Sequence, residues 1–468
     1  MNRRDRTARF RREPTVVATS EQRDRALAAS AVAALVSRIL TALSSLVSIG
    51  LAARALEAPE LGVVTVLSAL LVYFAFGDFG MGSMVMTQLP RAHALGDVAE
   101  MRRIVSSALS AMLIIASAAG VLGVVSVWVL PWQHLLGADD VASSELRITL
   151  VAFFIMGAVG IIGTVGSRVL AALQRAALIR VCDSVAAVVS VVLVGVCASV
   201  DGPIWVYLIA IFAPYSTTWL LQLAYVMLVH PELRVGLSAL DAGTGLRFLR
   251  EGSSYAVLSF GWVIAYTLDS IVVASVLGAA QAAVFAIAAR LFSLVYGTLS
   301  LAGQQMWPAM SEALARGDVE WVRRRFRHSL LAVGGVAAAS SLVLVAIGPT
   351  FTRLWVGEDL VPPLGLFAVL GVWTVYLTMI VQYSYLLMVA QKIWLLAVLG
   401  LVVGGVNLLV SILLTREIGL VGPVIGNLVS AASIQLVPMI VLTRRHLRRL
   451  LGDVTPAPDH LPHTRGDS

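Results

Sequence analysis

Long apolar runs limit the folds open to this chain more than any other feature. Runs of 18 to 27 residues recur between Leu27 and Leu442, and each can cross a hydrocarbon layer of about 30 Å as an α-helix. The mean hydropathy is +0.88 and only 13% of the residues are charged, so the apolar side chains exceed what a water-soluble interior can bury. These runs also exclude a membrane β-barrel, because the strands of a barrel would be about ten residues long with alternating polarity. We therefore expect an all-α integral membrane protein.

The sequence predicts twelve transmembrane helices with a defined orientation. If both termini are cytoplasmic, that side of the membrane holds 28 of the 34 Lys and Arg residues. Cytoplasmic loops retain positive charge, so we expect a multi-pass protein of the cytoplasmic membrane with both termini in the cytoplasm. The expected spans are 27–53, 61–86, 104–130, 148–173, 177–200, 203–229, 253–276, 283–307, 329–349, 362–388, 393–414 and 419–442.

An internal repeat divides the chain. The segment GDVAEMRR at 96–103 returns as GDVEWVRR at 317–324, and each copy follows the second span of its half. Two copies of six helices keep the same orientation, because six is even, and such parallel repeats suit transporters that rock one half against the other. The expected parts are an Arg-rich cytoplasmic tail (1–26), an N-terminal lobe (27–229), a cytoplasmic linker (230–252), a C-terminal lobe (253–442) and a cytoplasmic tail (443–468).

Three segments carry a family resemblance: ALEAPELGVVTV at 55–66, FGDFGMGS at 76–83 and LDSIVVASVLGAAQAAVFAIAARL at 268–291. They resemble the polysaccharide flippases of the MOP transporter superfamily, which export O-antigen and exopolysaccharide repeat units. The resemblance implies two MATE-like six-helix lobes around a central cavity and a polyprenyl-pyrophosphate-linked oligosaccharide as substrate. It implies no cofactor, and contacts with membrane lipids and polysaccharide assembly proteins. The two extra helices of the related lipid II flippases are not expected here.

An ionisable residue and several aromatic rings share one apolar stretch, SYAVLSFGWVIAYTLDSIVV at 254–273. On a helix of 100° per residue, Tyr255, Trp262, Tyr266 and Asp269 lie within about 80° of one another. A carboxylate facing lipid is costly, so this face is expected to line a cavity, where the rings stack on sugars and Asp269 carries the coupling ion, H+ or Na+. Helix packing is the alternative explanation of the rings.

Two arginines lie deep inside predicted spans of opposite halves. Arg290 shares a helical face with Gly297 and Gln304, and Arg38 shares one with Ser45. A guanidinium group matches two phosphate oxygens and keeps its proton when desolvated, so Arg38 and Arg290 are predicted to bracket a diphosphate. In the alternative, Arg290 and Asp269 form a structural lock, each offsetting the burial of the other.

Other charges near the membrane surface have simpler explanations. Asp78 is expected to form a structural or gating ion pair, or to cap a helix break. Asp183 is expected to pair with Arg180, three residues earlier on the same helix. Cys182 and Cys197 are fifteen residues apart on one span, too far for a disulfide with each other, and nothing indicates a metal site.

The preferred function is secondary transport by alternating access. The chain has no GxxxxGK[ST] phosphate loop, so an ion gradient or the flux of product is expected to drive it. The alternative is a multidrug or cation antiporter of the same superfamily. The buried arginines Arg38 and Arg290 favour an anionic substrate over a cationic one. An enzyme is not expected, because the acidic residues of the 131–147 loop are explained as solvated charges. Nucleic acid is not an expected partner, since the basic residues follow topology rather than a patch.

Overall fold

The computed structural model describes residues 20–74, 81–173, 175–235, 243, 245, 246, 250, 268–389 and 393–443. For 20–35 and 301–309 the description covers the backbone alone. All regular structure in the described ranges is helical. The predicted helical class is therefore correct for these residues.

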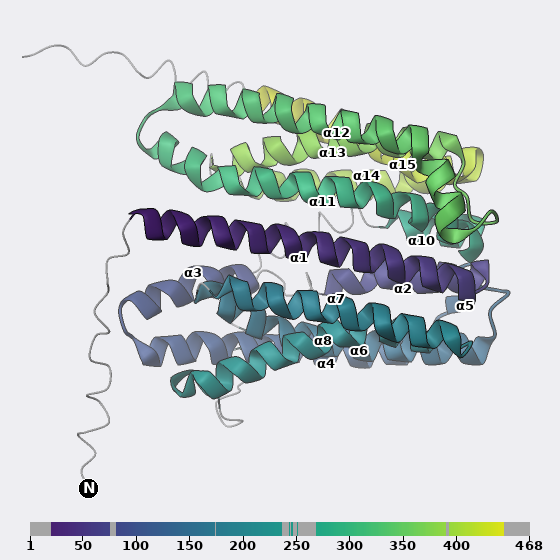
Figure 1. Ribbon diagram of the computed structural model, residues 1–468, viewed down its shortest axis with the longest axis horizontal. Helices are drawn as coiled ribbons and strands as arrows, with labels where there is room; N and C mark the ends of the chain where they lie inside the picture. The colour runs from purple at the N-terminus through teal and green to yellow at the C-terminus, as the bar shows by residue number, and fades with distance from the viewer. Residues whose placement is uncertain are drawn as a thin grey trace, which may run out of the picture.

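The first eight helices form the N-terminal group, whose members pack mainly on one another except α2, which packs mainly on α11, and α5, which contacts α10. α6 lies along α8 and α4, and α1 lies along α7; Figure 1 shows them as a layered bundle of long helices. The helices of this group are α1 (Ser20–Ala55), α2 (Ala58–Phe74), α3 (Met81–Ala94), α4 (Val98–Val129), α5 (Trp132–Leu135), α6 (Ser143–Ala172), α7 (Ala176–Ser199) and α8 (Ile204–Val229).

The remaining helices form the C-terminal group. α12 packs along α13, α11 packs on both, and α14 packs along α15. A 3-10 turn (Gly419–Val421) precedes α15, and a π-helical segment (Ala431–Leu436) follows it. The helices are α10 (Asp269–Leu277), α11 (Ala279–Ala315), α12 (Val319–Val356), α13 (Leu364–Val389), α14 (Ile393–Ile418) and α15 (Gly422–Ser430).

The number of membrane-length helices differs from the twelve expected spans. Among the described residues, nine helices are long and apolar enough to cross a membrane. The expected span 61–86 is shared between α2 and α3, and the expected span 253–276 is described only from residue 268. The last two expected spans run together as one apolar helical stretch, Trp394–Thr443. These three differences account for the smaller number.

The two copies of the GDV sequence fold into the same turn. Gly96 and Gly317 have φ angles of +68° and +79°, a conformation that glycine adopts without steric cost. The following residues, Asp97 and Asp318, each cap the next helix by accepting a backbone N–H three residues later at 3.0 Å. We call the end of the bundle with these turns the GDV end, and the other the opposite end.

Three pairs of helix starts are separated by the same number of residues as the two GDV segments. α2 and α11 begin at positions 58 and 279, α4 and α12 at 98 and 319, and α6 and α13 at 143 and 364. Each of these separations equals the separation between Gly96 and Gly317. A constant spacing over three pairs of helix starts and a shared turn geometry support an internal duplication. The structure therefore agrees with the repeat read from the GDV segments.

The two groups meet closely through α2 and α11. A methyl group on Gly62 of α2 would overlap the backbone of Ala279 at the start of α11. Small residues allow such close helix approach. The backbone N–H of Ala279 also donates to the carbonyl of Gly137, in the loop after α5, at 2.8 Å.

Two further contacts join the groups near the opposite end. The indole Nε1 of Trp355 on α12 donates to the carbonyl of Leu46 on α1 at 3.0 Å, and Trp355 lies over Gly50. Arg54, near the end of α1, donates to the carbonyl of Leu354 at 3.2 Å. We call these contacts, together with the Ala279 to Gly137 hydrogen bond, the closing contacts.

Candidate functional site

Arg38 of α1 reaches across to the C-terminal group. The residue is half-buried, and its guanidinium lies directly against Gly297 of α11, where a methyl group would overlap it. α1 and α11 lie next to each other in Figure 1. A predicted substrate residue therefore occupies the boundary between the two helix groups.

Arg290 of α11 makes the reciprocal contact. It is half-buried, and its guanidinium donates a hydrogen bond to the Ser45 hydroxyl of α1. Seven residues separate Arg38 from Ser45 and also Arg290 from Gly297, which is about 10 Å along a helix. The two arginines therefore project from opposite helices into the same boundary, at two levels. We call these four residues the arginine seam.

Neighbouring helices add charge and a phenol to the arginine seam. Arg180 of α7 is close enough to Arg38 to interact with it electrostatically, and Tyr215 of α8 interacts in the same way with Arg290 and Asp183. The hydroxyl of Ser37 donates to the carbonyl of Arg180 at 3.1 Å and holds α1 on α7. Three guanidinium groups and one carboxylate leave this region positively charged.

Of the other two residues predicted to form ion pairs, the structure describes Asp183 but not Asp78. Arg180 is exposed and Asp183 is half-buried, one turn apart on α7. The two attract each other electrostatically, but within the described residues no direct ion pair joins them. Asp78 lies outside the described residues.

Asp269 is the first residue of α10, and its partner is an amide. Asn427 of α15 donates from Nδ2 to the Asp269 Oδ2 at 2.6 Å. Arg290 points instead to the N-terminal group, toward Ser45. The lock between Asp269 and Arg290 that the sequence left open is therefore not formed in this conformation.

A buried polar chain continues behind Asp269. Asn407 of α14 donates from Nδ2 to Asn427 Oδ1 at 2.6 Å, and the Ser411 hydroxyl donates to Asn407 Oδ1 at 3.1 Å. Asn407, Ser411 and Asn427 are at most 3% exposed. The sequence analysis missed them, although the two Asn residues interrupt otherwise apolar helices and were a visible signal.

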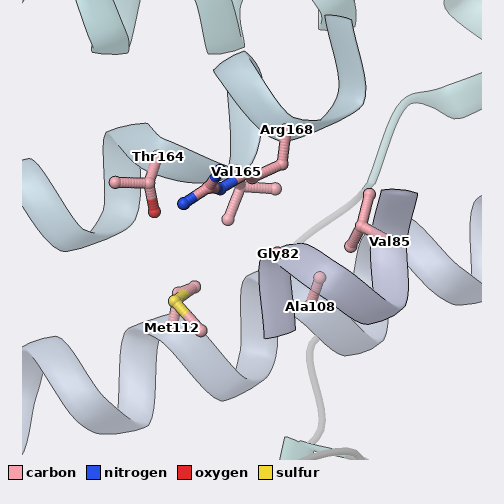
Figure 2. A pocket seen from close by; sticks show the side chains of 7 residues that line it. All are labelled: Gly82, Val85, Ala108, Met112, Thr164, Val165 and Arg168. Carbon is pink, nitrogen blue, oxygen red and sulfur yellow. The ribbon is translucent and has the colours of Figure 1, made fainter. Parts of the chain in front are cut away.

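A second arginine environment lies inside the N-terminal group. Figure 2 shows the Arg168 side chain extending from α6 into a small pocket that α3 and α4 complete. The sequence analysis did not single out Arg168, which lies within the expected span 148–173. The residues lining the pocket are Gly82, Val85, Ala108, Met112, Thr164, Val165 and Arg168.

The remaining predicted substrate residues are not placed by the structure. Tyr255, Trp262 and Tyr266 lie outside the described residues, and Gln304 belongs to the part of α11 described by backbone alone. Their role in sugar contacts stays a prediction.

The fold is that of MOP-superfamily transporters. An inward-facing multidrug resistance MATE family transporter of the MOP superfamily matches with a TM-score of 0.74 at 14% identity, over 91% of this chain and 100% of the other. The lipid II flippase MurJ in an inward closed conformation matches with a TM-score of 0.67 at 13% identity, over 91% and 93%. An outward-facing MATE transporter matches with a TM-score of 0.58 at 14% identity, over 88% and 96%. Such identities establish the fold alone.

Sequence comparison assigns the family. Residues 27–314 match the family described as "Polysaccharide biosynthesis protein", and the chain belongs to this family. A search of curated proteins finds no match. The family and the fold agree with the resemblance read from the sequence, while the transport role itself is a proposal.

Proposed function

We propose that this protein is a secondary transporter that flips a polyprenyl-pyrophosphate-linked oligosaccharide across the cytoplasmic membrane by alternating access. The translocated glycan then serves surface polysaccharide biosynthesis. Its partners are the lipid-linked glycan and the surrounding membrane lipids, and contact with polysaccharide assembly proteins stays a prediction. The family supports the glycan as substrate class, and the fold supports the transport mode.

The arginine seam is the observation that carries this proposal. Arg38 and Arg290 come from different helix groups and lie on one boundary, each against the other's helix. A pyrophosphate is a compact anion whose oxygens suit two planar guanidinium forks. Its oxygens would replace Ser45 as the acceptor for Arg290. Because the two arginines belong to different groups, relative motion of the groups changes their spacing and so the affinity for the headgroup.

The proposed layout has twelve transmembrane helices in two six-helix lobes, 27–229 and 253–442, with the linker 230–252 and both tails in the cytoplasm. The GDV end then faces the cytoplasm, in line with the basic residues near its turns. The closing contacts lie at the opposite end. In this orientation they close the external side, and the substrate enters from the inner leaflet.

Asp269 completes the proposal as the carrier of the coupling ion, H+ or Na+. Ionisable residues inside a membrane commonly mark proton and ion pathways. Tyr255, Trp262, Tyr266 and Gln304 are proposed to contact the sugars.

A substitution series on the arginine seam tests the proposal. Cells that lack the chromosomal copy and depend on a plasmid copy would carry Arg38→Gln or Arg290→Gln. We expect surface polymer to fall at least about tenfold, since losing a hydrogen bond to a charged group costs about 1.5–3 kcal/mol, while lipid-linked glycan accumulates on the inner leaflet. Lysine replacements keep the charge but lose the fork, so polymer output should be intermediate.

Arg416→Gln is the matched control, because Arg416 is exposed at the end of α14. It should leave polymer output unchanged. Normal polymer output from both Arg38→Gln and Arg290→Gln, at wild-type protein levels, would refute the role of the arginine seam.

The second candidate is a multidrug or cation antiporter of the same superfamily. The likeness to MATE transporters and the carboxylate of Asp269 favour it. However, the carboxylate hydrogen-bonds within the C-terminal group, whereas the boundary between the groups carries arginines. Cationic dye efflux from the deletion strain decides between the two, because an efflux defect without accumulation of lipid-linked glycan would support the antiporter.

A further inference from the structure

Helix α12 begins with an exposed group of basic side chains. Within the described residues, Arg323 has one ion pair, 3.6 Å from Glu320, and the other members of the group have no hydrogen bond or ion pair with the protein. Most of this positive charge is therefore not balanced by described protein groups. The members are Arg323, Arg324, Arg325, Arg327 and His328.

Packing on the opposite side of α12 fixes the direction of these side chains. Phe326 is buried against Tyr383 of α13, with the ring centroids 5.2 Å apart. At 100° per residue, Arg324, Arg325 and His328 lie within about 100° of one another and point away from Phe326. We call these three residues the basic face.

The basic face continues directly into an apolar one. Leu331, Leu342 and Val343 are exposed and lie on the same side of α12 as the basic face. The helix has 38 residues, which is about 57 Å at 1.5 Å per residue, whereas a hydrocarbon layer is about 30 Å thick. Exposed apolar residues of a membrane helix contact acyl chains, so the basic face lies next to them at the level of the lipid headgroups.

The first copy of the repeat has no such face. The equivalent positions of α4 hold Arg103, Ile104 and Ser107. Ile104 and Ser107 are buried, and Arg103 donates two hydrogen bonds to the Glu100 carboxylate, at 2.8 and 2.7 Å. A charge that only sets orientation across the membrane could lie anywhere near the GDV turns. Its concentration on the exposed face of one copy indicates a local binding role.

We propose that the basic face of α12 binds the phosphate headgroup of an anionic glycerophospholipid, whose acyl chains lie along Leu331 and the apolar residues that follow. The guanidinium groups of Arg324 and Arg325 hydrogen-bond to the phosphate oxygens, and His328 lies one turn closer to the hydrocarbon. A zwitterionic headgroup fits less well, because its own ammonium group is repelled by the arginines. The proposal goes beyond the transport function, since binding needs no glycan.

Native mass spectrometry of the purified protein tests this site in the absence of glycan. The protein would be released from uncharged detergent micelles that contain either anionic phosphatidylglycerol or zwitterionic phosphatidylcholine, and the bound lipid molecules would be counted at each lipid concentration. Each basic residue near an anionic surface contributes about fivefold in affinity. We therefore expect one phosphatidylglycerol molecule to bind about 25-fold more tightly than phosphatidylcholine.

Variants locate the bound lipid. Arg324→Gln combined with Arg325→Gln should remove this preference for phosphatidylglycerol and leave phosphatidylcholine binding unchanged. Arg324→Lys combined with Arg325→Lys keeps the charge but loses the planar fork, so the affinity should be intermediate. The matched control is Arg91→Gln combined with Arg175→Gln, which removes the same charge from exposed positions near the same end of the bundle. It should keep the affinity.

Leu331→Ser distinguishes a lipid from a soluble anion. It removes an apolar contact next to the basic face, so the affinity for phosphatidylglycerol should fall several-fold, and excess inorganic phosphate should displace little of the lipid. Displacement by inorganic phosphate, together with unchanged affinity in Leu331→Ser, would identify a soluble anion and overturn the lipid site.

Two further outcomes would overturn the proposal. Equal affinities for the two lipids would exclude a headgroup site and leave the basic face to an acidic protein partner. An equal loss in the Arg91 and Arg175 control would reduce the effect to non-specific attraction. None of these results bears on glycan flipping, which the Arg38 and Arg290 variants test.

Discussion

At the scale of single residues, the arginine seam depends on the absence of a side chain at Gly297 as well as on the two arginines. The guanidinium of Arg38 lies where a side chain on Gly297 would be. Arg38 is long and flexible, so a methyl group at Gly297 can displace it without breaking the helix. Gly297 is therefore a positioning residue for a proposed substrate contact.

Gly297→Ala should lower polymer output several-fold, because it moves the Arg38 guanidinium away from its place on α11. The thermal unfolding midpoint should change little or rise, since Ala favours a helix by about 1 kcal/mol over Gly. Gly405→Ala is the control, because nothing lies within 4 Å of the position its methyl group would take. Unchanged output from Gly297→Ala would remove Arg38 from the headgroup site.

The sequence could indicate which residues matter here but not how they pair. Helical periodicity placed Ser45 with Arg38 and Gly297 with Arg290 on common faces. The actual pairs cross between helices, Arg38 with Gly297 and Arg290 with Ser45, and depend on how the two groups dock. Asn407 and Asn427 escaped notice for the same reason, since their hydrogen bond joins residues twenty positions apart.

At the scale of elements, the two GDV turns are connections between helices whose geometry follows directly from the local sequence. A glycine with positive φ ends one helix, and an aspartate caps the next. Their geometry needs only local sequence, so the eight-residue repeat marked both turns. The expected spans 104–130 and 329–349 nevertheless begin later than α4 at Val98 and α12 at Val319. By contrast, the last two expected spans are not separated by an extended loop, because α14 and α15 are joined by a short 3-10 turn, Gly419–Val421.

Removing the caps should weaken both joints to a similar degree. Asp97→Ala and Asp318→Ala should each lower the free energy of unfolding by about 0.5–2 kcal/mol, measured as a lower thermal midpoint in detergent. Asparagine at either position accepts the same N–H and should restore most of the loss. Asp140→Ala, in an exposed loop at the opposite end, serves as control. A loss at one turn only would show that the two are not equivalent.

At the scale of the whole molecule, the closing contacts link the two helix groups. They join α1 to α12, and the loop after α5 to α11, at the opposite end of the bundle. Each is a modest interaction, about 1 kcal/mol net for a hydrogen bond. Under the proposed function, a few such contacts suit a transporter, since its closed state must be stable and still able to open.

Trp355→Phe should shift this balance toward opening at that end. It removes the indole donor to Leu46 and leaves an aromatic ring, so the open population should rise about fivefold. Nitroxide labels on Asp140→Cys and Asp359→Cys, after replacement of Cys182 and Cys197, report the separation of the two groups by pulsed electron spin resonance. Trp394→Phe, at an exposed position, should leave the distance distribution unchanged. An identical distribution in Trp355→Phe would exclude this hydrogen bond as a closing contact.

The acceptors in the closing contacts are all main-chain carbonyls, those of Leu46, Gly137 and Leu354. Such acceptors exist at every position of a polypeptide, so the hydrogen bonds accepted at Leu46 and Leu354 do not themselves require a particular side chain there. The exposed position 354 can therefore change its side chain and keep this hydrogen bond, whereas Leu46 also packs against the hydrophobic core. The strength of each contact can therefore change through the donor residue alone, without a compensating change of the acceptor residue.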